Sequence, residues 1–326
     1  MALDHRPARP PGTPDNSGGP GTAGSSRRGP AWLSATGRRR PNGLAVIAGV
    51  AALLYAGFIL LPLGLSLASS LTDENPLKAE SSFVGLDNYQ HLFRDGRLLH
   101  SLAFTFALAA VVTLAANAVG LGLAVLLDRS SLPYRLMRTL AFLPQVLSGV
   151  IVGFIWRSVL TQNGLANALL MDAGIIREPI GWLGTPFMAS LSIAIVMAWV
   201  LSGFTTVVYL AALQAVPRDL YEAATVDGAG AARRFRSITF PLLAPATTIN
   251  VTICLITVLK LYDVITVVTG GGPASSTEST ALYIVKVAFT QNQFGYSSAV
   301  AVLLLVVSTG VSLLVTSLLR RREVSL

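Results

Sequence analysis

The stretch that determines how this chain folds is Tyr221-Glu222-Ala223-Ala224-Thr225-Val226-Asp227-Gly228-Ala229-Gly230, which continues to Phe235, Ile238, Pro241 and Pro245. It lies between two long apolar segments, on the side of the chain where arginines collect. The polar segment around it, residues 214–241, is about 28 residues long, whereas a simple connection between helices needs only a few. Its length and its central turn predict a folded element that binds a partner.

The composition predicts an all-α membrane protein. Hydrophobic residues make up 52% of the chain and charged residues 12%, and the mean hydropathy is +0.63. An ordinary soluble domain carries about 25% charged residues. Apolar runs near the length of about 20 residues that a membrane-spanning helix needs occur at 43–69, 101–127, 139–160, 187–213, 242–268 and 298–319. We therefore expect six transmembrane helices.

The distribution of Lys and Arg predicts the orientation. If the N-terminus is cytoplasmic, the inner segments contain the arginines of residues 38–40, 129–138, 218–236 and 320–322. The outer loops then contain more acidic than basic residues. Because cytoplasmic loops are enriched in Lys and Arg, both termini are expected in the cytoplasm. This asymmetry accounts for the net charge of +8, so the charge does not indicate nucleic-acid binding.

The two ends of the chain fall outside this membrane domain of residues 43–322. Residues 1–42 are rich in Pro, Gly, Ser and Arg, so they bury too little apolar surface to fold and are expected to form a disordered cytoplasmic tail. Residues 323–326 form a short C-terminal tail. A cleaved secretory signal is the alternative for the first apolar run, because Ser66-Leu67-Ala68 resembles a cleavage site. The run exceeds the usual length of about 7–15 residues, which favours a retained first helix.

No pattern in the sequence indicates an active site, a metal site or a bound cofactor. The single cysteine, Cys254, excludes an internal disulfide and a cysteine-based metal site. A phosphate-binding P-loop needs a lysine directly after glycine, and Lys78, Lys260 and Lys286 each follow another residue. If this protein uses ATP, another chain hydrolyses it.

The polar segment itself predicts two short helices that meet at a glycine corner. Residues 218–226 can form about two helical turns, and Gly228 can adopt the positive φ that ends a helix. A second short helix is expected through Phe235 and Ile238, and Pro241 is expected to begin the fifth membrane helix. The alternative is an amphipathic loop lying among lipid headgroups. That alternative would explain the arginines but not the turn.

The pattern Glu222-Ala223-Ala224, then Asp227-Gly228-Ala229, then Ile238, Pro241 and Pro245, resembles the EAA loop of binding-protein-dependent ABC importer permeases. Three further stretches resemble the carbohydrate-uptake branch related to maltose permeases: Val84-Gly85-Leu86-Asp87-Asn88-Tyr89, Gly270-Gly271-Gly272-Pro273 and Phe294-Gly295-Tyr296-Ser297-Ser298-Ala299. Together these resemblances cover residues 43–322. The EAA pattern is specific for ABC import, whereas no single residue in the other stretches recognises a sugar.

The resemblance implies a type I importer permease fold in the bacterial cytoplasmic membrane, paired with a second homologous permease and surrounded by membrane lipid. It implies that the EAA loop is a coupling helix docked on a dimer of ATPase subunits, which bind ATP and Mg. An extracytoplasmic solute-binding protein would deliver the sugar. Glu222 would then make the ionic contact, Ala223 and Ala224 the close-packed face, and Asp227, Gly228 and Ala229 the corner.

Polar residues of the fifth apolar run are candidates for a substrate path: Asn250, Thr257, Lys260, Tyr262 and Asp263. Lys260 and Asp263 are three residues apart, so one helix would place them on one face, where they could pair. A structural ion pair at the outer gate is the alternative to substrate contact. Pro144 predicts a kink in the third membrane helix.

The expected function is therefore that of a permease subunit of an ATP-driven importer for a sugar or oligosaccharide. The alternative is a secondary transporter or channel that needs no ATPase. Such a protein would more often carry intramembrane charges aligned as an ion path, and only Lys260 and Asp263 fit that description. A membrane scaffold or sensor would usually carry a folded soluble module, which this sequence does not predict.

Overall fold

The computed structural model of the protein describes residues 43–78, 80–129 and 131–321. The chain divides into two units, residues 1–55 and 56–326. The described part of the first unit is α1 (Gly43–Tyr55), whose side chains from Ala45 onward are exposed. The predicted tails at residues 1–42 and 323–326 lie outside the described residues.

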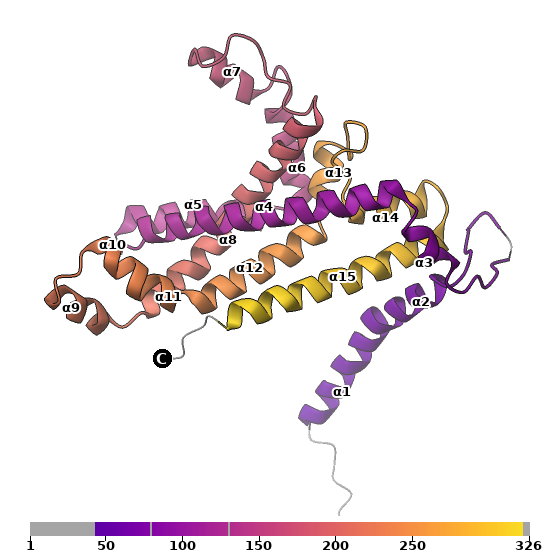
Figure 1. The fold of residues 1–326 in the computed structure, drawn as a ribbon, viewed down its shortest axis with the longest axis horizontal. Helices are drawn as coiled ribbons and strands as arrows, with labels where there is room; N and C mark the ends of the chain where they lie inside the picture. Colours follow the sequence, from indigo (N-terminus) through magenta and orange to yellow (C-terminus); the bar gives the residue numbers. More distant parts are fainter. Residues whose placement is uncertain (1–42, 79, 130, 322–326) are drawn as a thin grey trace, which may run out of the picture. The chain divides into compact units, whose positions relative to one another are not determined.

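The described part of the second unit is mostly helical (Figure 1). It begins with a π-helical turn, Ala56–Leu60, and a second π-helical turn spans Phe235–Thr239. Its α-helices are, in chain order, α2 (Leu61–Ser69), α3 (Asp87–Leu92), α4 (Gly96–Leu126), α5 (Leu132–Val146), α6 (Gly149–Val159), α7 (Leu165–Asp172), α8 (Pro186–Ala215), α9 (Arg218–Val226), α10 (Ala231–Arg234), α11 (Phe240–Leu242), α12 (Ala244–Leu259), α13 (Asp263–Val268), α14 (Thr280–Phe289) and α15 (Phe294–Arg320).

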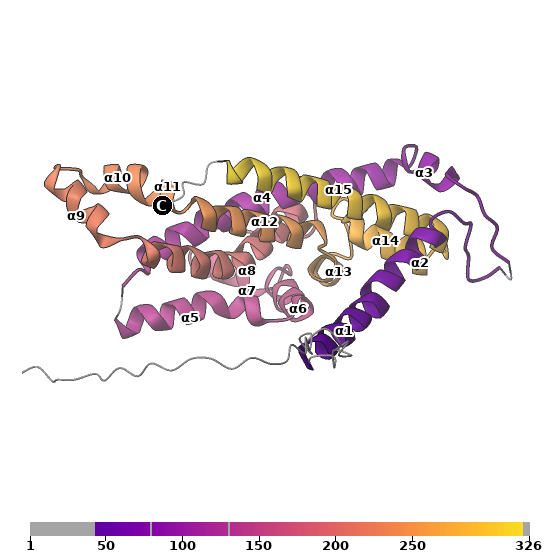
Figure 2. The same ribbon diagram turned by 90° about the horizontal axis from the view of Figure 1, so that it is seen from below.

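The long helices of this unit form a bundle. Helix α4 packs along α8 and also against α12, and α8 is further covered by α5. Helix α15 packs on α12, α14 and α2, and the short α13 packs on α6. Figures 1 and 2 show α4, α8 and α12 side by side, with α9 and α10 at one end of the bundle and α3 and α14 at the other. The two ends are therefore separated by the length of the long helices.

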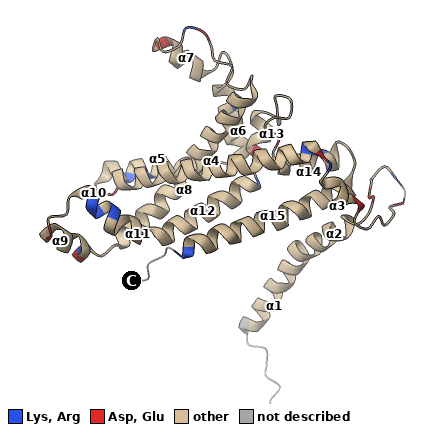
Figure 3. Ribbon diagram, viewed as in Figure 1, with Lys and Arg blue, Asp and Glu red and all other residues tan. Residues whose placement is uncertain are grey.

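Charged side chains follow the same division. Figure 3 shows Lys and Arg on α10 and at the last turn of α15, and further charged residues near α3 and α14, with little charge along the helices between. A charge-poor middle with charged ends is what a membrane-spanning bundle requires.

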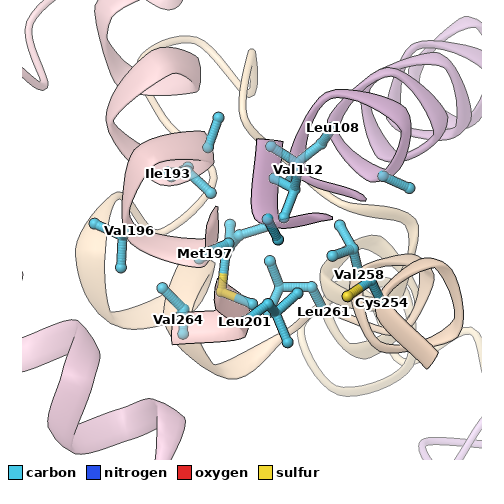
Figure 4. Packing of buried hydrophobic residues seen from close by; sticks show 14 of the residues in the cluster. Leu108, Val112, Ile193, Val196, Met197, Leu201, Cys254, Val258, Leu261 and Val264 are labelled. Atoms are coloured by element: carbon cyan, nitrogen blue, oxygen red, sulfur yellow. The ribbon is translucent and has the colours of Figure 1, made fainter. Parts of the chain in front are cut away.

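A cluster of buried apolar side chains holds the bundle together (Figure 4). Val112 of α4, Ile193 and Met197 of α8 and Val258 of α12 are each almost fully buried in this cluster. Small residues let the helices approach closely, as is common in membranes. At Gly203 of α8, an added Cβ would overlap a backbone carbonyl oxygen of α5.

Six spans are compatible with the structure. Four helical runs are long and apolar enough to cross a membrane: Ala45–Ser69, Gly96–Leu126, Pro186–Ala215 and Phe294–Arg320. Two pairs of helices pass the same test together but are sharply bent, α5 with α6 by 101° and Ala231–Leu242 with α12 by 63°. The predicted first, second, fourth and sixth spans are thus confirmed to within a few residues at each end.

The third and fifth spans differ from the prediction. The predicted kink at Pro144 is instead a complete break after Val146, where α5 ends and α6 begins at Gly149. The fifth run does not continue as one helix to residue 268, because α12 ends at Leu259 and α13 is a separate helix. Its start also differs, since Pro241 lies in the short α11 and Leu243 separates α11 from α12.

Candidate functional site

The EAA segment folds into the predicted helix and corner. Helix α9 begins after Pro217, which occupies the N-cap position with φ −59° and ψ 131°, and ends at Val226. The Gly228 N–H donates to the Thr225 carbonyl at 3.0 Å, and the Ala229 N–H donates to the Ala224 carbonyl at 2.9 Å. These two bonds are those of a Schellman motif, which needs a left-handed residue just past the helix. Gly228 supplies it with φ +73°.

The surface of α9 is open. Helix α9 has no buried residue. Glu222, Ala223, Asp227 and Gly228 are exposed, and Ala224 and Ala229 are half-buried. Two apolar side chains are also exposed, Val226 at 88% and Leu220 at 37%. A helix that leaves both faces uncovered gains little from packing within this chain.

Helix α9 is nevertheless tied to the bundle. The hydroxyl groups of Tyr221 and Thr239 lie 2.9 Å apart and share a hydrogen bond. The Arg234 Nη1 donates to the Thr225 hydroxyl at 2.8 Å, which fixes α10 against α9. The Thr239 carbonyl in turn accepts from the N–H of Leu243 at 3.0 Å. Leu243 is buried in a second apolar cluster with residues of α4 and α8, so hydrogen bonds and packing connect α9 to the bundle.

The candidate path residues separate into two groups. Thr257, Lys260 and Tyr262 are exposed. Lys260 lies at one end of a groove between α12 and α15. Its mostly apolar lining includes Ile256, Leu305 and Leu313 together with Thr252, Ser308, Thr309, Ser312 and Thr316. The Thr257 hydroxyl donates to the Ile253 carbonyl at 2.8 Å within its own helix.

Asn250 is buried and Asp263 is half-buried, and both contact neighbouring helices. The Asn250 Nδ2 donates to the Thr205 carbonyl of α8 at 3.3 Å, and Asn250 is fully buried. Asp263 begins α13, where its Oδ1 accepts the Val264 N–H at 2.9 Å, and it lies against Gly149 so closely that a Cβ there would overlap it. Both residues are thus placed where they join helices.

The predicted pairing of Lys260 with Asp263 is wrong. Among the described residues the ion pairs are Lys78–Asp73, Arg97–Glu278 and Lys286–Glu278. The two residues do not share a helix, because the chain breaks at residues 260–262. The Ser279 hydroxyl donates to the Leu261 carbonyl at 2.6 Å, so a distant segment satisfies the backbone group that the break frees.

A polar network at the opposite end of the bundle was not singled out from the sequence. The Glu278 carboxylate is 1% exposed and accepts from the Arg97 guanidinium at 2.7 and 2.9 Å. The ammonium of Lys286 lies 2.8 Å from the same carboxylate. Burial alone would raise the pKa of Glu278, but the hydrogen bonds from these two cations lower it by more. The net pKa is therefore below its ordinary value, and the carboxylate stays charged. Arg97 and Glu278 are 181 positions apart, and no single-sequence signal links them.

Asp95 extends this network to the start of α4. Its Oδ1 accepts the N–H groups of Arg97 and Leu98 at 3.0 and 3.1 Å, which caps the helix. Its Oδ2 accepts hydrogen bonds from the hydroxyl groups of Tyr283 and Tyr296, the latter at 2.7 Å. Burial raises the pKa of Asp95, but these hydrogen bonds outweigh it and the pKa is lowered. Asp95 therefore joins the starts of α4 and α15 to α14.

No group of three or more His, Cys, Asp or Glu side chains that could hold a metal occurs in the described part of the chain.

The family that matches the chain is the binding-protein-dependent transport system inner membrane component, over residues 116–324, which include the whole EAA segment. The chain belongs to this family. The permease is therefore a multi-pass inner-membrane transport subunit and not an enzyme.

Curated relatives are similar over most of the permease. It is 33% identical over 82% of its length to the probable starch degradation products transport system permease of Thermoanaerobacterium thermosulfurigenes, covering 90% of that protein. It is 34% identical over 86% of its length to the lactose transport system permease of Rhizobium radiobacter, covering 95% of that protein. It is 33% identical over 76% of its length to the trehalose/maltose permease of Thermococcus litoralis, covering 83% of that protein.

A solved structure has the same fold. The permease matches a chain of a bacterial ABC transporter involved in the import of the acidic polysaccharide alginate with a TM-score of 0.74. The sequence identity is 21%, and the match covers 85% of the permease and 95% of that chain. The likeness confirms the predicted type I importer permease fold. The relatives above are all named as transport system permeases, which supports the ABC importer over the alternative of a self-sufficient carrier or channel.

Proposed function

We propose that this permease forms the translocation path of an ATP-driven sugar or oligosaccharide importer together with a second, homologous permease. The relatives named for starch degradation products, lactose and trehalose or maltose support a saccharide substrate. An extracytoplasmic solute-binding protein delivers the sugar, in keeping with the family description. Both termini lie in the cytoplasm, as the distribution of arginines predicts.

The proposal rests on three features of α9: the helix ends in a defined glycine corner, it is hydrogen-bonded to the bundle, and its own surface is left uncovered. In the proposed function this surface docks on a dimer of ATPase subunits, which bind ATP and Mg and hydrolyse the ATP. Glu222 supplies the ionic contact, and Ala223 and Ala224 allow close approach. Asp227, Gly228 and Ala229 hold the corner that keeps α9 at a fixed angle.

Motion of the ATPase dimer then reaches the bundle through the contacts already described. The Tyr221–Thr239 hydrogen bond is the first, and the backbone bond from Leu243 to Thr239 is the second. Because Leu243 is 1% exposed and packed against α4 and α8, a shift of α9 moves several membrane helices together. This arrangement suits a change between inward-facing and outward-facing states.

The sugar passes along the exposed side of α12. Thr257 and Lys260 offer a hydroxyl and an ammonium group on that side, and the aromatic ring of Tyr262 is 37% exposed where the helix has ended. A neutral sugar binds through such polar donors and by stacking on an aromatic ring. Asn250 and Asp263 lie away from this exposed side and hold the helices in place, because Asn250 joins α12 to α8 and Asp263 joins α13 to α6.

The variant Glu222→Lys tests the coupling role. In proteoliposomes that contain the complete importer and its binding protein, we expect uptake to be lost, while the two permeases still copurify. Glu178→Lys makes the same charge change at an exposed position after α7 and should keep normal uptake. Normal uptake by Glu222→Lys would refute the proposed ionic contact.

A further inference from the structure

An arginine-rich cavity lies at the end of the bundle where α4, α5, α8 and α9 meet. It has a volume of about 680 Å³, and the side chains that matter here are those of Arg129, Arg135, Arg138, Arg218, Asp128 and Gln214. We call this cavity the arginine pocket. It contains four guanidinium groups and one carboxylate, so its electrostatic potential favours an anion.

The carboxylate does not neutralise these arginines. None of the ion pairs among the described residues involves the arginine pocket. The carboxylate of Asp128 accepts a long hydrogen bond of 3.5 Å from the Gln214 amide instead. The pocket therefore keeps an excess of positive charge next to an apolar bundle.

The four arginines differ in how far they are already engaged. Arg138 donates to the carbonyl of Leu127 at 3.0 and 2.6 Å and to that of Arg129 at 2.7 Å. It therefore satisfies backbone carbonyl groups just past the end of α4. Arg129 donates to the Tyr134 hydroxyl at 2.9 Å. Arg135 and Arg218 are exposed and make no side-chain hydrogen bond within the described part of the chain. Two guanidinium groups are thus available to a ligand.

The depth of the pocket matches that of lipid phosphates. The pocket lies where α4 ends at Leu126, where α5 begins at Leu132 and where α8 ends at Ala215. These are ends of candidate membrane spans, which place the pocket at the interface between water and hydrocarbon. Basic pockets between membrane helices on the cytoplasmic side are suited to anionic headgroups.

Helix α5 adds an apolar strip that leads away from the pocket. Its leucines at the helical spacing of three or four residues are all exposed, between 53% and 68%: Leu132, Leu136, Leu140 and Leu143. An acyl chain can lie along such a strip. A free phosphate ion would make no use of it.

We propose that the arginine pocket binds the phosphate of an anionic phospholipid, with an acyl chain along the leucine strip of α5. Guanidinium groups bind phosphate oxygens through paired N–H donors, which is the chemistry that Arg135 and Arg218 leave open. Because Arg218 is the first residue of α9, the lipid joins the start of α9 to the end of α4. This lipid site lies apart from the proposed sugar path on α12, but it includes the first residue of α9 and therefore adjoins the proposed coupling helix.

The test is native mass spectrometry of the purified complete importer, titrated with phosphatidylglycerol, phosphatidylcholine or inorganic phosphate. The test variant is Arg135→Gln/Arg218→Gln. The matched control is Arg233→Gln/Arg236→Gln, which removes two exposed arginines from the neighbouring segment outside the arginine pocket. Arg135→Lys/Arg218→Lys keeps the charge and the fold but removes the paired donors.

We expect the test variant to bind phosphatidylglycerol about a hundredfold more weakly, since each charge-assisted contact from a guanidinium group to the phosphate contributes about a factor of ten. The control should bind as the wild type does, and the lysine variant should fall between them. Equal weakening in the test variant and the control would mean diffuse surface attraction and would overturn the site. Saturation of the pocket by inorganic phosphate at the same concentration as by phosphatidylglycerol would overturn the lipid assignment, and so would equal binding of phosphatidylcholine.

Discussion

The substitution Glu278→Gln is predicted to destabilise the end of the bundle where α3 and α14 lie. Glu278 is 1% exposed and holds two cations, Arg97 at the start of α4 and Lys286 in α14. Lys286 also donates to the Gly270 carbonyl at 2.9 Å. The glutamate therefore joins α4 and α14 to the glycine-rich turn that follows α13. Glutamine keeps the shape of the side chain but removes its charge.

The magnitude follows from how far each partner is exposed. Removing one partner from a buried ion pair costs about 3–5 kcal/mol when the other charge stays buried. Here the side chain of Arg97 is 42% exposed and that of Lys286 is 29% exposed, so both can regain water. Glutamine can also still accept a hydrogen bond. We therefore expect a loss of about 2 kcal/mol, which corresponds to a fall in melting temperature of about 4–8 °C.

The assay is thermal unfolding of the purified permease in detergent, followed by intrinsic fluorescence. The matched control is Glu178→Gln, which makes the same change at an exposed glutamate and should shift the melting temperature by less than about 1 °C. Equal melting temperatures for Glu278→Gln and Glu178→Gln would refute the reasoning, because the buried carboxylate would then contribute nothing.

Three further outcomes are expected. Gly228→Ala forces a side chain into the left-handed region and should destabilise the corner of α9 by about 1–2 kcal/mol, measured as faster hydrogen exchange of α9 amides. Gly230→Ala is the control, because its φ of −67° and open surroundings accept a Cβ, and equal exchange in the two variants would contradict the strain argument. Gly203→Ala should lower the melting temperature, because its Cβ overlaps backbone of α5, and an unchanged value would refute that contact. Burial tends to raise the pKa of Glu278, but its basic partners lower it by more, so the net pKa is lowered. A carboxyl group whose pKa is lowered in the folded state stabilises the fold at pH values above its unfolded pKa of about 4.3. This contribution to stability is lost as the pH falls. The difference in melting temperature between the wild type and Glu278→Gln should therefore shrink below about pH 4. A difference that stays constant with pH would contradict this effect of the Glu278 charge.

Features that depend on neighbouring residues could be predicted from the sequence. The bounds of α9 agree with the predicted 218–226. Pro217 and Gly228 mark them locally, because Pro217 stands at the N-cap just before the helix and Gly228 adopts positive φ just after it. The long apolar runs likewise locate the spans, because hydrophobic length is itself the requirement for crossing a membrane.

Features that depend on distant residues could not be predicted. The break after Leu259 is supported by a hydrogen bond from the Ser279 hydroxyl to the Leu261 carbonyl, which residues 260–263 alone do not reveal. Glu278 lies in the segment between α13 and α14, and its partners Arg97 and Lys286 come from α4 and α14, a combination that no pattern in the sequence reveals. Asn250 is buried against α8 because of how α12 is rotated, which hydrophobicity alone does not specify at that position.

The most direct test of the account is site-specific cross-linking from α9 to an ATPase subunit in the assembled importer. Val226→Cys places a thiol on the most exposed part of α9, and the native Cys254 is buried. Leu165→Cys on α7, at a position that is 59% exposed, provides an accessible control away from α9. The account predicts an adduct with the ATPase from Val226→Cys and none from Leu165→Cys. A Val226→Cys thiol that is labelled by a small reagent but forms no adduct would contradict the coupling role of α9.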